Sequence, residues 1–165
     1  MSEFTTALVV SPLADGKSWV LIEKLTYHIG NELSHDRVTA GQGFVTDFAS
    51  VPRIFWWIIP KWGKYGNAAV IHDWLYCQQT EKNRAESDNI LYEAMGVLDV
   101  VPWKKTVIYY AVRLFGWIAW LRNAAEKEIG YNRIIQTEQL KATTPSNRPG
   151  TLNSIYSYLK TKQQH

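Results

Sequence analysis

The sequence has only one cysteine, Cys77, among its 165 residues. A single thiol cannot form an internal disulfide, and it cannot build a zinc site that needs several cysteines, so both kinds of framework are excluded. Histidine is also scarce: there are four, and His28, His35 and His165 lie in unrelated contexts. A zinc site built mainly from histidines is therefore not indicated either.

Charge of one sign and long apolar runs are lacking as well. The net charge is +3 and the basic residues are scattered, so we expect no nucleic-acid partner. The apolar stretch 106–121 is interrupted by Arg113 and is shorter than the roughly 20 residues of a membrane span. The opening "MSEFTTALVV" has no basic segment before an apolar one, so no signal peptide is expected.

Apolar and aromatic residues are abundant. Apolar residues make up 46% of the chain, which includes eight tryptophans and nine tyrosines, and this composition favours a globular domain with a substantial core. Residues 1–47 contain stretches rich in β-branched and aromatic residues, separated by Asp15-Gly16, Gly30-Asn31 and the glycines of "GQG". These features predict three or four short strands in an antiparallel β-meander.

After Asp47 the sequence favours helices. We predict a helix that starts near Pro52 and ends before Pro60, a helix from Asn67, and a long helix over residues 103–128. Between the last two, Asn83 and Glu86 have the spacing of a capping box. The predicted fold class is α+β, with one domain over residues 1–130, a polar linker over 131–152, and a C-terminal tail or docking helix over 153–165.

Two polar residues occupy apolar rows of neighbouring helices. His72 follows Ala68 by one turn and precedes Tyr76, while Asp88 begins the row continued by Leu91. Counted from Thr80 in the short connection, His72 is eight residues before and Asp88 eight residues after. In an antiparallel pair they therefore lie at the same height and can face each other. The carboxylate would then fix one imidazole nitrogen and leave the other free as a general base, or the pair is a hydrogen-bonded part of the core.

Asp73 lies about 100° further round the same helix, so it points elsewhere. Its carboxylate is a candidate ligand for Ca²⁺, with backbone carbonyls of glycine-containing loops such as "GQG" as further ligands; a solvated surface carboxylate is the alternative. Tyr76 is expected in the core, with its hydroxyl bonded to a buried carboxylate.

The stretch "FVTDFASVPR" is a second concentration of polar residues. Asp47 either caps the following helix or is carried by the strand end to the His72 site. Ser50 is a weak candidate nucleophile because no GxSxG motif surrounds it. Arg53 and Arg84 are expected to pair with these acidic groups or with an anionic ligand.

Four stretches together resemble a family of small proteins found in tailed-phage and prophage genomes and classed as a domain of unknown function. They are "FVTDFASVPR", "AAVIHDWLY", "RAESDNILYEAM" and "YYAVRLFGW", which lie between residues 40 and 120. The resemblance implies a viral origin, with the virion or the host cytoplasm as the location. It implies no particular reaction.

The HDxxY motif followed by a helix that carries another aspartate is also similar to the active-site helices of phospholipase A2, including the parvovirus type. This likeness implies that His72 activates water, Asp88 orients His72, Asp73 holds Ca²⁺ and Tyr76 supports Asp88. The glycine-rich calcium loop of those enzymes has no clear counterpart before this helix.

Three hypotheses follow. The first is a phage-encoded phospholipase A2-like hydrolase that acts on bacterial membrane lipid with at most interfacial membrane contact. The second is a non-enzymatic virion or tail-associated protein that binds other virion proteins and forms a homo-oligomer, with the His/Asp cluster as a buried polar network. The third is a phage hydrolase of another class with Asp47, His72 and Asp73 around a metal.

Overall fold

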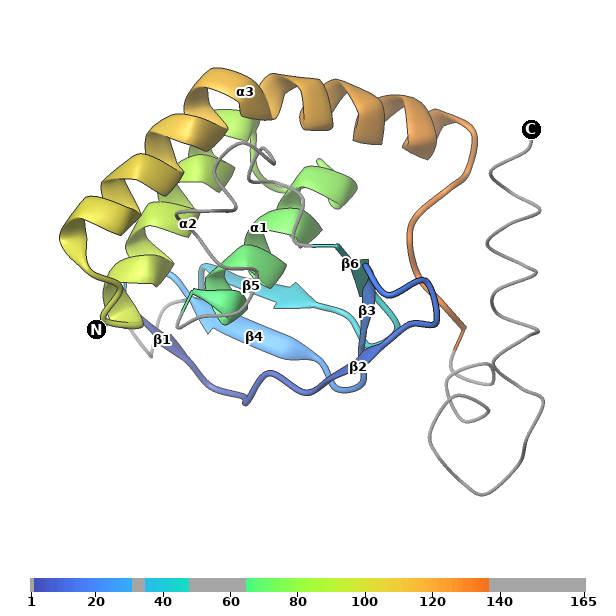
Figure 1. Cartoon of the computed structure of the whole chain (residues 1–165), viewed down its shortest axis with the longest axis horizontal. Coiled ribbons are helices and arrows are strands. Elements are labelled where there is room, and N and C mark those ends of the chain that lie inside the picture. Colours follow the sequence, from blue (N-terminus) through green and yellow to red (C-terminus); the bar gives the residue numbers. More distant parts are fainter. Residues whose placement is uncertain (1, 31–34, 48–64, 137–165) are drawn as a thin grey trace.

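The computed structural model describes residues 2–30, 35–47 and 65–136, and it has an α+β fold, as predicted. Six short strands come first: β1 (Glu3–Phe4), β2 (Val10–Pro12), β3 (Trp19–Leu21), β4 (Leu25–His28), β5 (Arg37–Ala40) and β6 (Val45–Thr46). Three helices follow: α1 (Gly66–Gln78), α2 (Arg84–Val97) and α3 (Pro102–Glu128). Figure 1 shows the strands below α1 and α2, and α3 passing over both helices.

The strands form two antiparallel sheets of three strands, in the orders β1-β4-β5 and β2-β3-β6. Only the β2–β3 and β4–β5 pairs join strands that are neighbours in sequence, so the strands do not form one continuous meander. The β2–β3 turn is stabilised by Asp15, whose carboxylate accepts hydrogen bonds from the backbone of Lys17 and Ser18, and Gly16 adopts a φ of +65° there. Glycine is favoured at that position because it has no Cβ to clash.

The helix boundaries follow local sequence signals. Asn83 caps α2, and with Glu86 it forms the reciprocal hydrogen bonds of the predicted capping box. Pro102 begins α3, where its missing N–H costs no helical hydrogen bond. The helix predicted near Pro52 and the predicted C-terminal helix lie outside the described residues.

Helix α1 lies at the centre of the molecule. It contacts β4, β5 and β6 on one side and α2 and α3 on the other. Nine of its residues are buried, including His72 and Asp73. Because nearly every side of this helix is covered, its polar side chains need hydrogen-bond partners from neighbouring elements.

The core fills the space between the sheets and α1, and continues between α1 and the other two helices. Its fully buried members include Leu25, Tyr27, Val38, Ile71, Met95, Ile108 and Val112. Packing continues beyond α3, since Phe44 and Ile134 form an antiparallel bridge and Ile135 packs with Leu13 and Val20. Within the described residues, no helix is long and apolar enough to span a bilayer.

Candidate active site

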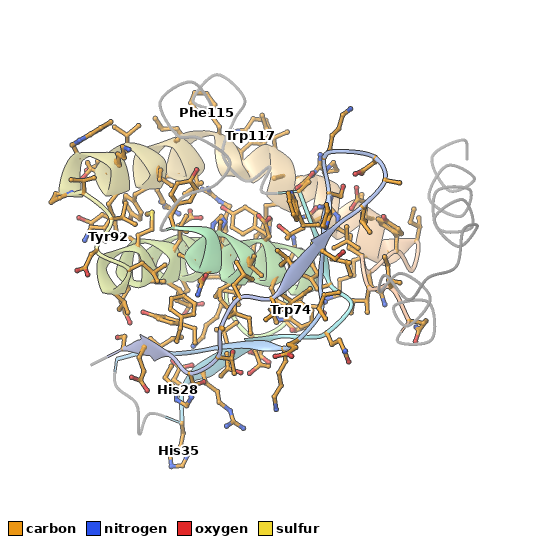
Figure 2. The ribbon with its side chains drawn as sticks, turned by 60° about the horizontal axis from the view of Figure 1, so that its bottom comes forward. His28, His35, Trp74, Tyr92, Phe115 and Trp117 are labelled. Atoms are coloured by element: carbon orange, nitrogen blue, oxygen red, sulfur yellow. The ribbon has the colours of Figure 1, made fainter. Side chains whose placement is uncertain are left out.

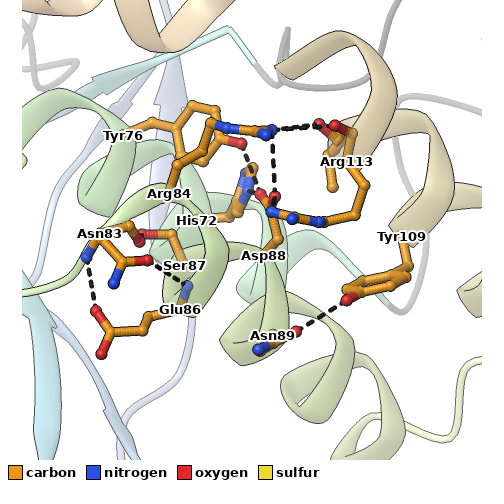
Figure 3. Close-up of polar contacts among 11 residues, drawn as sticks. His72, Tyr76, Asn83, Arg84, Glu86, Ser87, Asp88, Asn89, Tyr109 and Arg113 are labelled. Atoms are coloured by element: carbon orange, nitrogen blue, oxygen red, sulfur yellow. Dashed lines mark hydrogen bonds and ion pairs between the residues drawn. The ribbon is translucent and has the colours of Figure 1, made fainter. Parts of the chain in front are cut away.

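Helices α1 and α2 bring His72 and Asp88 into direct contact. Nε2 of His72 lies 2.9 Å from Oδ1 of Asp88, and both side chains are fully buried. The pairing is the one that their equal distances from Thr80 predict. Capping by Asn83 fixes where α2 begins and therefore where Asp88 lies along α1 (Figure 3).

Three further groups surround the Asp88 carboxylate. Tyr76 donates a hydrogen bond of 2.6 Å to Oδ1, the same oxygen that His72 contacts. Arg113 of α3 donates to Oδ2 at 2.9 Å, and Nη1 of Arg84 lies 3.6 Å from that oxygen. One buried carboxylate therefore links all three helices, and two guanidinium groups offset its negative charge.

These contacts set the ionisation state of Asp88. Burial alone would raise the pKa of its carboxyl group, but hydrogen bonds from His72, Tyr76 and Arg113 outweigh burial and hold the pKa below its usual value. Asp88 is thus ionised at neutral pH, and an ionised carboxylate can only accept hydrogen bonds. Nε2 of His72 must therefore carry the proton that lies between the two residues.

The proton on Nε2 also determines the state of the other ring nitrogen of His72, Nδ1. In neutral imidazole, a proton on Nε2 leaves a lone pair on Nδ1. Nδ1 is buried and has no hydrogen-bond partner in the described part of the chain. A buried acceptor without a partner is rare in proteins because it loses its hydrogen bonds to water without replacement. In this arrangement Asp88 orients the imidazole through Nε2, and the lone pair on the buried Nδ1 is not used by a described residue.

Helix α3 holds the pair from the opposite side. Gly116 packs against Tyr76 so closely that a Cβ built on the glycine would lie 2.6 Å from the tyrosine hydroxyl. Arg84 donates to the backbone carbonyl of Arg113 at 3.1 Å. Trp120 packs edge-on against the Tyr76 ring. Tyr76 and Asp88 are therefore fixed by the middle of α3.

Asp73 belongs to a different polar cluster. It is 6% exposed and accepts a hydrogen bond from the hydroxyl of Thr46 in β6. Asp73, Asp47 and Arg133 each lie close enough to the Cys77 thiol for their charges to act on its pKa. Burial raises the pKa of Cys77 to about 12, so its thiol is protonated at neutral pH. Arg133 also donates to Glu126 and Asn123, and so connects residues after α3 to this cluster.

The groups around Asp73 bear on the calcium site predicted there. In the described residues, no three His, Cys, Asp or Glu side chains are grouped so that they could hold a metal ion. Asp73 already accepts from Thr46, and Arg133 contributes positive charge nearby. The calcium site predicted at Asp73 relies on backbone carbonyls as its further ligands; it stays a prediction, and the proposed reaction does not depend on it.

The sequence-based candidates therefore fall into three groups. His72, Tyr76, Arg84 and Asp88 lie together. Asp47 lies close enough to Cys77 for its charge to act on that thiol, as does Asp73. Ser50 and Arg53 lie outside the described residues. Sequence reasoning missed Arg113 as a partner of Asp88, although an arginine that interrupts an apolar run was a usable signal for a buried ion pair.

Comparison with known proteins identifies the family. Residues 19–112 match the model of a family described as "Protein of unknown function (DUF1353)", and since the match spans more than half of the chain, the protein belongs to this family. The matched region includes α1 and α2 with the whole His72–Asp88 pair, and it ends one residue before Arg113. No curated protein and no solved structure gives a significant match.

Proposed function

We propose that this member of the DUF1353 family is a hydrolase in which His72 is the general base and Asp88 orients it. The observation that carries the proposal is that Nδ1 of His72 is buried and has no hydrogen-bond partner among the described residues, while an ionised carboxylate holds Nε2 in place. A structural histidine would normally satisfy both ring nitrogens. A general base needs one nitrogen fixed and the other available for a proton.

In the proposed reaction, Nδ1 of His72 removes a proton from a water molecule, and the water oxygen attacks the carbonyl carbon of an ester. The bond to the alcohol oxygen then breaks, and the proton returns from His72 to that oxygen. Asp88 stays ionised throughout and stabilises the imidazolium that forms in between. The products are a carboxylic acid and an alcohol, and no oxidant and no co-substrate other than water is required.

The resemblance of the HDxxY motif to phospholipase A2 supports a phospholipid as the ester. The motif set also supports a tailed-phage or prophage origin, in which bacterial membrane lipid is the available substrate. Because His72 and Asp88 are fully buried, turnover requires an opening that lets water and the ester reach Nδ1.

The test is fatty-acid release from vesicles of phosphatidylcholine and phosphatidylglycerol, measured by mass spectrometry with calcium or with EDTA. The matched variant is His72→Gln, whose amide N–H can still reach Asp88 but which has no base. Wild type should release fatty acid, and the variant should stay folded while its rate falls by about 10² to 10⁴. Equal rates, or no release by wild type from either lipid, would overturn the proposal. Loss of activity in EDTA would support the calcium prediction.

A second candidate is a non-enzymatic virion or tail-associated protein. His72 and Asp88 are completely buried, and Asp88 joins helices α1, α2 and α3. Both features favour a structural role, because such a network also fixes how helices pack. In this case His72→Gln changes stability and no activity exists to be lost. Proteomic analysis of purified phage particles tests it directly: the protein should be present at a fixed copy number in virions.

A further inference from the structure

Helix α3 exposes a row of large apolar side chains on the side away from the core. The row, here called the α3 ridge, consists of Trp103, Tyr110, Leu114, Trp117, Ile118 and Leu121, and each member is between 51% and 64% exposed. Figure 2 shows Trp117 at the outer edge of the helix. Single exposed apolar residues are common, but a continuous row of this kind marks an interaction surface.

The ridge is uncharged along its length. Successive members are separated by seven, four, three, one and three residues, and at about 100° per residue they fall within an arc of about 100°, so they share one face of the helix. Thr106 and Ala125 are also exposed at these spacings, and both are uncharged. Two tryptophans and one tyrosine belong to the ridge, and these residues are favoured at the boundary between lipid and water.

Basic residues border the ridge on one side. Lys104 and Arg122 each follow a ridge member by one position, about 100° round the helix, and Nε of Arg122 lies 3.7 Å from a carboxylate oxygen of Glu126. Helix α3 contains five basic and two acidic residues, so its net charge of 5 − 2 = +3 equals that of the whole chain. An apolar face with a basic border is the pattern of helices that lie on anionic bilayers.

The shape of α3 favours a deformable partner. The helix bends near its middle around the helices beneath it, so its solvent side is convex (Figure 1). The ridge side chains are exposed to solvent and therefore belong to that side. Two copies of a convex ridge would touch only near the bend. A bilayer surface can adjust to the ridge and bury more of it.

We infer that the α3 ridge binds the surface of a bilayer rich in anionic lipid, with its apolar side chains at the acyl boundary and Lys104 and Arg122 near the phosphates. The ridge is then the surface through which the proposed hydrolase meets its substrate. The identity of that substrate lipid rests on the proposed function. The opposite side of the same helix holds Tyr76 and Asp88 through Gly116 and Arg113.

The experiment is co-sedimentation of the full chain with vesicles of phosphatidylcholine alone, or of phosphatidylcholine and phosphatidylglycerol in equal parts. All proteins carry His72→Gln, so lipid hydrolysis cannot change the vesicles. The ridge variant adds Leu114→Ser and Trp117→Ser, the charge variant adds Lys104→Glu and Arg122→Glu, and the matched control adds Val97→Ser, an exposed apolar residue of α2.

We expect binding to the anionic vesicles that weakens as salt rises and is at least tenfold weaker on phosphatidylcholine alone. The ridge and charge variants should each lose at least tenfold in affinity, and the control should bind like its parent. No binding to anionic vesicles, or unchanged binding by the ridge variant, overturns the inference. The inference is also overturned if analytical ultracentrifugation shows a dimer that the ridge variant abolishes, while the parent protein does not bind vesicles. That result would assign the ridge to contact with a second copy of the chain.

The outcomes separate this inference from the proposed function. Ridge-dependent binding without fatty-acid release by wild type contradicts only the hydrolase. Release from a short-chain, monomeric phospholipid without vesicle binding contradicts only the role of the ridge.

Discussion

The hydroxyl of Tyr76 occupies the space in which a side chain at position 116 would lie. A Cβ built on Gly116 would be 2.6 Å from Oη of Tyr76, and the same hydroxyl donates to Asp88 at 2.6 Å. The glycine of α3 is therefore required by a residue of α1 and not by its own backbone conformation.

Gly116→Ala should accordingly destabilise the protein. The added methyl group forces Tyr76 or α3 to move, and overpacking of this kind costs about 1–3 kcal/mol. The displaced hydroxyl also weakens a buried hydrogen bond to Asp88. Urea denaturation followed by circular dichroism measures the change, and an unaltered midpoint would contradict the packing described here.

Gly96 provides the control for that substitution. A Cβ at Gly96 in α2 would meet only the end of the flexible Lys105 side chain, at 3.3 Å. Alanine is favoured over glycine inside a helix by about 0.5–1 kcal/mol. Gly96→Ala should therefore leave stability unchanged or raise it.

The contacts that depend on spacing along one helix, or across the short connection between two helices, could be predicted from the sequence. Equal counts from Thr80 predicted that His72 faces Asp88, and the Asn83 and Glu86 pattern predicted where α2 begins. Both are found in the structure. Periodicity could not predict that α3 crosses the pair with Arg113 and Gly116, because the path of a helix across two others depends on packing between distant segments.

The strand order illustrates the same limit. Turn residues such as Gly16 indicate where a strand ends, and they correctly separate β2 from β3. They do not indicate that β1 pairs with β4 or β3 with β6. Strands β4 and β6 contact α1, and Phe4 of β1 and Trp19 of β3 pack against the core, so these pairings depend on the core and not on local sequence alone.

Asn83→Ala tests the capping box that positions α2. The substitution removes the side-chain acceptor for the backbone N–H of Glu86, at 3.0 Å. Loss of such a cap costs about 0.5–2 kcal/mol. Thermal unfolding should show the loss, while Asn83→Asp, which keeps an acceptor oxygen, should retain most of the stability. Equal losses in both variants would contradict a capping role.

Cys77 should react slowly with thiol reagents. Burial raises its pKa to about 12, and the nearby Arg133 offsets only part of this effect. Against an ordinary pKa near 9, about a thousandfold less thiolate is present at pH 8, and thiolate is the reactive form. Iodoacetamide labelling followed by mass spectrometry should therefore be at least about a hundredfold slower in the native protein than in urea. Similar rates in both conditions would contradict the environment described for this thiol.

Asp88→Asn tests the carboxylate that joins the three helices. The substitution removes a buried negative charge and presents an amide N–H to donors, leaving the charge of Arg113 without its partner. Breaking a buried ion pair from one side costs about 3–5 kcal/mol. Urea denaturation at pH 7 should show a loss of this size, whereas Asp36→Asn, at a solvent-exposed ion pair with Lys82, should cost less than about 1 kcal/mol.

The pH dependence of the stability difference between wild type and Asp88→Asn provides a sharper test of the same carboxylate. The pKa of Asp88 is lower in the folded protein than in the unfolded chain, where it is about 3.9. Its contribution is therefore fully present above the unfolded pKa and is lost as the pH falls through the folded value. The stability difference between wild type and Asp88→Asn should stay constant from pH 7 to about pH 5, then shrink below about pH 3.9 as the wild-type carboxyl becomes protonated. A difference that is independent of pH down to the acid unfolding of the protein would show that helix packing depends on the shape of this side chain and not on its charge.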